Sequence, residues 1–99
     1  MQIKLSKSNR KNKKYKVVIT DGERTKTVHF GAEGYSDFTK HKDTERKKRY
    51  IARHQKRENW NKSGIYTAGF WSRWLLWNKP TIEESIKDIE KRFKVSIQG

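Results

Sequence analysis

Three of the protein's four tryptophans fall within one short segment, Gly69–Pro80, which reads GFWSRWLLWNKP. Only 31% of the 99 residues are hydrophobic, so this segment holds a large share of the apolar surface that the chain can bury. A large aromatic side chain buries roughly 150–250 Å² when it packs inside a fold. The segment must therefore lie in the core or hold a partner, and the rest of the fold has to be arranged around it.

The spacing of the aromatic residues in this segment favours the core. Phe70, Trp74 and Trp77 recur at i, i+4 and i+7, and Trp71 and Leu75 form a parallel row, as in a helix that is apolar on most sides. Stacking on nucleic-acid bases would need rings exposed on a sheet or in a groove, and docking onto another protein is the intermediate alternative. The candidate aromatic core or docking residues are Trp60, Phe70, Trp71, Trp74 and Trp77.

Turn and capping residues predict the other elements. Tyr15–Thr20 is rich in β-branched residues, Asp21-Gly22 is a typical two-residue hairpin turn, and Arg24–Phe30 alternates as a second strand. We expect Val28 and Phe30 to pack against alternate residues of the first strand.

Two helices are indicated by their N-terminal caps. Asp43 is predicted to cap a helix that extends to about Arg57, and Thr81–Glu84 forms a capping box before a second one. The apolar stripe of that second helix is Ile82, Ile86, Ile89 and Phe93. The sequence thus predicts an α+β fold in which an N-terminal β-hairpin packs against about three helices. We expect a basic N-terminal arm at residues 1–14 and a single small α+β domain at residues 15–99.

The net charge of +14 is concentrated in two blocks. Residues 1–16 carry seven bases and no acid, and residues 40–62 carry ten bases against three acids. Self-repulsion destabilises a compact state, so a polyanionic or acidic partner would relieve it. The candidate polyanion- or partner-binding residues are Lys11, Lys13, Lys14, Arg46, Lys47, Arg49, Arg53, Lys56 and Arg57. The alternative is that these charges only form a solvated face of a helix.

A membrane is the least favoured of the possible partners. The apolar stripe of the basic helix consists of Tyr50, Ile51 and Ala52, which is too narrow to insert into a lipid surface. No apolar run approaches the roughly 20 residues of a membrane span. We therefore expect nucleic acid or an acidic protein face as the partner.

The residue pattern does not favour catalysis. The chain has no cysteine, which excludes disulfides and Cys-based zinc sites. His41, His54, Asp43 and Glu58 could form a metal-dependent nuclease site, but the H-x-x-x-H and H-E-x-x-H spacings are missing. We expect His54 to pack beside Tyr50 and His41 to lie in a polar loop. The prediction is a non-enzymatic protein with no cofactor, no metal and no small-molecule substrate.

Two stretches of the sequence resemble a known family. The first is VHFGAEGYSDFTKHKDTERKKRYIARHQKRENW, and the second is AGFWSRWLLWNKPTIEESIKDIEKRF. They are similar to small basic proteins of unknown function encoded by large nucleocytoplasmic DNA viruses. The likeness runs from about Tyr15 to Phe93, with HFG…GYSDFT…HKD and LLWNKP as its distinctive strings. The resemblance implies a viral setting and supplies no catalytic or ligand residues. In such viruses small basic proteins commonly serve as virion components, in the capsid lattice or with the genome, so we expect a virion protein made in an infected host cell.

Two functions fit these observations. In the first, the protein is a virion structural protein, a minor capsid or capsid-associated component that bridges acidic surfaces of other virion proteins through its basic helix and arm. In the second, it binds viral DNA or RNA non-specifically and stays with the packaged genome, with an affinity that falls steeply with salt. We favour the first, because a basic arm of this composition should be disordered when free, and a large assembly is the simplest partner that would hold it.

Overall fold

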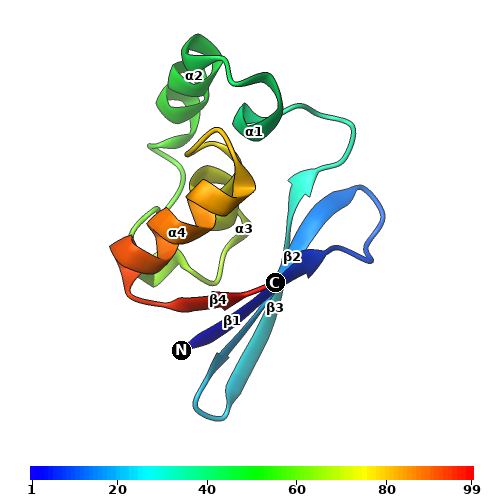
Figure 1. Ribbon diagram of the computed structural model, residues 1–99, viewed down its shortest axis with the longest axis vertical. Helices are drawn as coiled ribbons and strands as arrows, with labels where there is room; N and C mark the ends of the chain where they lie inside the picture. The colour runs from blue at the N-terminus through cyan, green and yellow to red at the C-terminus, as the bar shows by residue number, and fades with distance from the viewer.

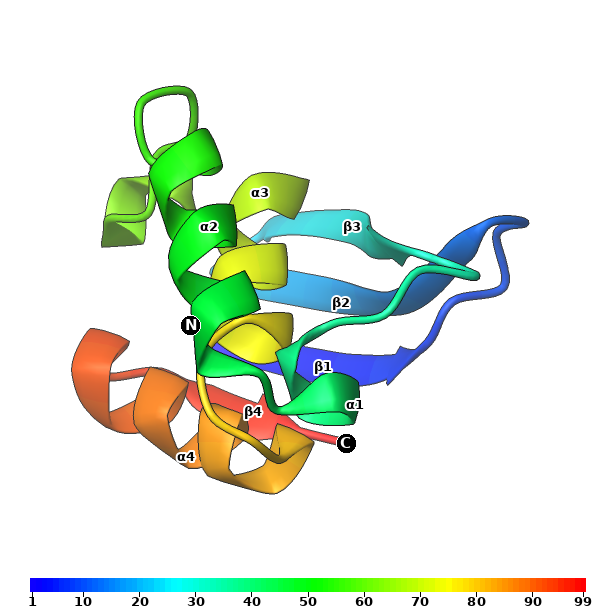
Figure 2. The ribbon, with the colours of Figure 1, turned by 90° about the horizontal axis from the view of Figure 1, so that it is seen from above.

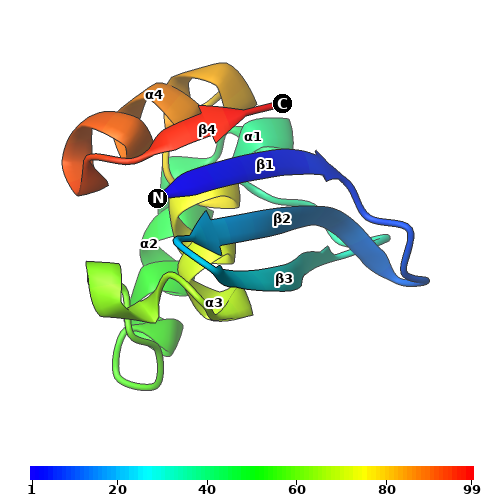
Figure 3. The same cartoon turned by 90° about the horizontal axis from the view of Figure 1, so that it is seen from below.

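The computed structural model describes residues 1–99 as a four-stranded sheet with all of its helices on one face (Figure 1). The strands are β1 (Gln2–Lys7), β2 (Lys13–Asp21), β3 (Arg24–Ala32) and β4 (Ser96–Gln98). Their order in the sheet is β3-β2-β1-β4, which Figure 3 shows from the open side of the sheet. β2 pairs antiparallel with β1 and with β3, whereas β4 pairs parallel with β1. The α+β fold predicted from the sequence is confirmed.

The helical part of the chain lies between β3 and β4. Its elements are α1 (Phe38–His41), α2 (Thr44–His54), the 3₁₀ turn η1 (Lys62–Gly64), α3 (Ala68–Trp71), the π-helical turn η2 (Ser72–Leu76) and α4 (Ile82–Phe93). Figure 2 shows α3 between α2 and the sheet, so α2 forms an outer layer. None of these helices has the length and apolar character that crossing a membrane requires.

The predicted hairpin is confirmed, with its turn shifted by one residue. Asp21 pairs with Arg24, so the loop consists of Gly22 and Glu23 rather than Asp21 and Gly22. Gly22 takes a φ of 63°, a backbone conformation that glycine adopts at no steric cost. The alternation of buried and open side chains along the two strands is the one that the sequence predicts.

The basic arm predicted for residues 1–14 is wrong. β1 lies inside the sheet, between β2 and β4, with Ile3 paired to Ile19 on one side and to Ile97 on the other. Ile3 and Leu5 are buried in the core, and Lys4 between them faces the open side of the sheet. The proposed boundary at residue 14 therefore cuts through a single folded unit, because β1 and β2 belong to the same sheet.

The core lies between the sheet and the α3–η2–α4 layer. Trp71 and Phe70 are fully buried, as predicted for the aromatic segment. The ring of Trp71 packs on Phe30 of β3, with 6.1 Å between centroids, and the ring of Phe70 packs on Phe93 of α4 at 5.0 Å. The tryptophan segment thus joins the hairpin to the last helix.

The predicted single row of aromatic residues is interrupted at η2. The backbone N–H of Trp77 donates to the carbonyl five residues earlier, which is the π-helical pattern. Phe70 and Trp74 both contact Phe93, but Trp77 lies outside that row and stacks on Tyr50 of α2. The extra residue in the turn accounts for the different direction, because it rotates the side chains that follow.

The predicted helix caps are confirmed. The Asp43 side chain accepts hydrogen bonds from backbone N–H groups of the first turn of α2, and these bonds lower the pKa of its carboxyl. Thr81 caps α4: its hydroxyl oxygen accepts from the backbone N–H of Glu84, and its O–H donates to the Glu84 carboxylate. The return bond of a full capping box, from the Thr81 backbone N–H to the Glu84 side chain, is replaced by this side-chain contact. α2 ends at His54, one turn before the predicted Arg57.

Replacing Ile3 by alanine tests whether β1 belongs to the core. Because Ile3 is only 1% exposed, we expect Ile3→Ala to lower the free energy of unfolding by about 2–5 kcal/mol in urea denaturation. Lys4→Ala changes the next residue, on the open face, and should stay within about 0.5 kcal/mol of wild type. A free arm would give equally small effects at both positions.

Candidate polyanion-binding groove

A groove with a volume of about 550 Å³ lies between α2 and the open ends of β2 and β3. One wall is α2, and the opposite wall is formed by Lys13, Lys14 and the segment Tyr35–Asp37. The first residues of α3 and η2 also line the groove. Side chains far apart in the sequence therefore face a common space.

Three arginines of α2 line this groove. Arg46, Arg49 and Arg53 are spaced i, i+3 and i+7, which places them on one face of the helix. All three are exposed and none is part of an ion pair. Lys13, also without an acidic partner, lines the wall formed by β2. Four free cations thus line the groove from two separate elements.

Lys14 lines the groove too, but its charge is already compensated. Its Nζ lies 2.6 Å from Oδ2 of Asp37 and also donates to the carbonyl of Tyr35. The side chains of this ion pair are 10% and 3% exposed. Asp37 additionally accepts from the backbone N–H of Thr39 at the start of α1. Lys14 therefore holds β2 to the segment before α1, and this ion pair accounts for its charge without a partner.

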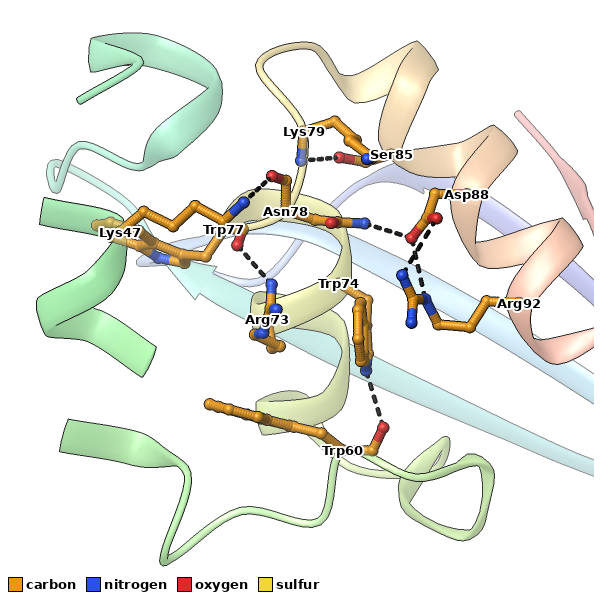
Figure 4. Close-up of polar contacts among 10 residues, drawn as sticks. All are labelled: Lys47, Trp60, Arg73, Trp74, Trp77, Asn78, Lys79, Ser85, Asp88 and Arg92. Atoms are coloured by element: carbon orange, nitrogen blue, oxygen red, sulfur yellow. Dashed lines mark hydrogen bonds and ion pairs between the residues drawn. The ribbon is translucent and has the colours of Figure 1, made fainter. Parts of the chain in front are cut away.

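Lys47 is likewise a packing residue. Its Nζ donates to the carbonyl of Asn78 at 2.6 Å (Figure 4). The same Nζ lies 4.9 Å from the centre of the Phe38 ring. Burial lowers the pKa of this ammonium. The side chain fastens α2 to the chain that follows η2, so it does not offer a free charge to a partner.

The remaining predicted basic residues lie elsewhere on the surface. Lys11 is exposed in the connection between β1 and β2, and Lys56 and Arg57 are exposed in the turn after α2. None of the three lines the groove. The structure thus brings part of the predicted set together in the groove, namely Lys13, Lys14, Arg46, Arg49 and Arg53. All of these except Lys14 lack an acidic partner.

The groove contains little negative charge to balance these cations. Its acidic residues are Asp37, which is paired with Lys14, and Glu58. The Glu58 carboxylate lies against Gly69, where a Cβ would stand 1.3 Å from Oε2. Because low-dielectric walls focus the field of charges inside a cleft, the uncompensated arginines attract anions more strongly here than on an open surface.

Aromatic stacking fixes the wall that carries the arginines. Tyr50, the buried residue of α2, stacks on Trp77 with ring centres 4.4 Å apart and an interplanar angle of 3°. The ring of His54 also stacks on Tyr50, with 4.4 Å between ring centres, as predicted. Burial raises the pKa of Tyr50 to about 12, so its phenol is neutral near pH 7.

His41 was predicted in a polar loop, and this is wrong. It is the last residue of α1, and its ring centre lies 5.2 Å from that of Trp77. Burial and the nearby Arg46 lower its pKa. No three His, Asp or Glu side chains come together to hold a metal ion.

Arginines of the same chain cover the rings of Trp60 and Trp74. The Arg73 guanidinium lies 5.4 Å from the ring centre of Trp60 and 4.4 Å from that of Trp74, and Arg92 lies 4.5 Å from Trp74 (Figure 4). Trp74 also donates its indole N–H to the carbonyl of Trp60. The sequence did not predict Arg73 as a packing residue, because nothing in its spacing separates it from a surface arginine.

These observations describe a small basic α+β protein with an arginine-lined groove. The chain belongs to a family of unknown function, DUF5754, whose model matches residues 3–54. The matched stretch starts within β1 and ends with the last residue of α2, so it includes Lys13 and the three groove arginines. Comparison with curated proteins and with solved structures finds no significant match.

Removing the Lys14 charge tests the buried ion pair. Lys14→Met leaves the Asp37 carboxylate buried without its partner, and we expect the free energy of unfolding to fall by about 3–5 kcal/mol in urea denaturation. Lys13→Met removes the neighbouring charge, which has no ion pair, and should stay within about 0.5 kcal/mol of wild type. Equal stability of the two variants would contradict a structural role for Lys14.

Proposed function

We propose that the protein is a non-enzymatic nucleic-acid-binding protein that holds a phosphate backbone in its groove. The observation that carries this proposal is that Arg46, Arg49, Arg53 and Lys13 line one groove without an acidic partner. The planar guanidinium group matches phosphate oxygens with two parallel hydrogen bonds. Contacts to phosphates are independent of base sequence, so the binding is non-specific.

The surface composition favours a nucleic acid over an acidic protein face. Protein interfaces depend on a few buried aromatic or large apolar anchors. Here the exposed large hydrophobic residues are only Met1 and Tyr35, while Trp60 and Trp74 are covered by arginines of the chain itself. A set of cations without an apolar patch is suited to a highly charged, hydrated backbone.

The second candidate is the structural virion component that bridges acidic surfaces of capsid proteins. It would use the basic surface outside the groove, including Lys11, Lys56 and Arg57, all of which are exposed. It has lost part of its support, because the extended basic arm on which it relied is folded into the sheet as β1. For the viral setting implied by the resemblance, we therefore propose viral DNA or RNA as the partner.

Two triple variants separate groove binding from general charge. Arg46→Gln/Arg49→Gln/Arg53→Gln removes the groove arginines, and Lys48→Gln/Lys56→Gln/Arg57→Gln removes the same charge outside the groove. Fluorescence anisotropy with a labelled DNA oligonucleotide, measured over a series of salt concentrations, gives affinity and salt slope. We expect the groove variant to lose most of its affinity. The slope of log affinity against log salt concentration should become shallower by about 2–3 units, since each lost phosphate contact removes about 0.7–0.9. The control variant should keep both.

Equal losses in the two variants would mean that net charge alone governs binding. Both variants should unfold at the same urea concentration as the wild-type protein, because all six side chains are exposed. Lys47 is left unchanged because it packs against Asn78. Wild-type protein that fails to bind DNA or RNA at moderate salt would contradict the proposal. Fractionation of virions into shell and genome core would then test the structural alternative.

A further inference from the structure

Tyr35 is the only aromatic residue whose side chain is largely exposed to solvent. It is 73% exposed and lines the groove on the wall opposite the arginines of α2. Each of the other tyrosines has a ring partner within the chain: Tyr15 stacks on Phe30, Tyr50 stacks on Trp77, and Arg24 lies over Tyr66. The Tyr35 ring takes part in no aromatic pair and no cation–π contact, so nothing in the fold accounts for it.

The backbone of Tyr35 is held in place although its side chain is free. Its N–H donates to the carbonyl of Ala32 at 3.3 Å, and its carbonyl accepts from Nζ of Lys14. The same ammonium binds the buried carboxylate of Asp37 two residues later. The ring is therefore carried at the groove by a fixed segment. Because tyrosine has only two side-chain torsions, it loses little entropy when it becomes ordered on a ligand.

We propose that the groove binds single-stranded nucleic acid, with phosphates on the arginines of α2 and a base stacked on Tyr35. This inference rests on the proposed function and names the form of nucleic acid. Bases in a duplex are covered by their neighbours, whereas every base of a single strand offers a free face for stacking. A groove of about 550 Å³ has the size of a small-molecule site, which accepts nucleotide units but not a double helix.

This arrangement predicts binding without sequence preference. Stacking on an aromatic ring tolerates any base, and the arginines contact the backbone common to all nucleotides. Single-stranded DNA and RNA should therefore both bind.

The test measures binding of the full chain to three ligands. The first ligand is a single strand of about 20 nucleotides, which is longer than most single-strand binding sites. The second is a duplex of the same length. The third is inorganic polyphosphate, which has charges but no bases. Fluorescence anisotropy reports binding of the two labelled nucleic acids, and the unlabelled polyphosphate is measured by its competition with the labelled single strand. We expect the single strand to bind more tightly than the duplex. Tyr35→Ala should weaken single-strand binding by about tenfold and leave polyphosphate binding unchanged, while Tyr35→Phe should retain wild-type affinity.

The three ligands distinguish failure of this inference from failure of the proposed function. If none of them binds the wild-type protein, the proposed function itself is wrong. If the duplex binds as well as the single strand, or if Tyr35→Ala has no effect, the groove binds phosphate without stacking and the inference is overturned. An equal loss of polyphosphate binding in Tyr35→Ala also overturns it, because a ligand without bases cannot report stacking. Urea denaturation controls for folding, since an exposed side chain should not change stability.

Discussion

The stack of Tyr50 on Trp77 is the contact on which the candidate site depends. α2 exposes most of its residues, and Tyr50 is the one that it buries. An aromatic pair contributes about 0.5–1.5 kcal/mol beyond the area that it removes from water, which matters for a helix with so little apolar surface. The hydrogen bond from Lys47 to Asn78 adds a second point of attachment. Together they hold the arginines across the groove from Lys13.

The position of Trp77 depends in turn on the π-helical turn η2. A regular helix would leave Trp77 near the row of Phe70 and Trp74, which packs against α4. The additional residue directs it to α2 instead. One segment therefore serves two layers: its first half fills the core beneath the sheet, and its end supports the outer helix. The aromatic residues and the basic residues, which are adjacent in the sequence, thus have different roles, because the former position the latter.

Local signals in the sequence predicted the elements that local interactions determine. The hairpin and the caps at Asp43 and Thr81 depend on neighbouring residues, so they could be found without the fold. β1 was missed because its two apolar residues, Ile3 and Leu5, alternate with polar ones in a lysine-rich stretch, and because one of its two partner strands, β4, lies more than 90 residues further along the chain. Lys14 could not be told from Lys13, since only the folded chain brings Asp37 beside one of them. The groove itself joins two elements that no spacing rule connects.

The parallel pairing of β4 with β1 has a consequence for the order of folding. This pairing sets residue 3 beside residue 97, so one edge of β1 stays open until residue 97 has left the ribosome. Contacts between such distant residues close a long loop and slow folding. During synthesis, β1 can pair early with β2, but its other edge remains unprotected and can pair with other chains. Lys4 and Lys7 of β1 carry positive charges on that unprotected strand. These charges repel the same strand of another nascent chain and so oppose pairing between chains.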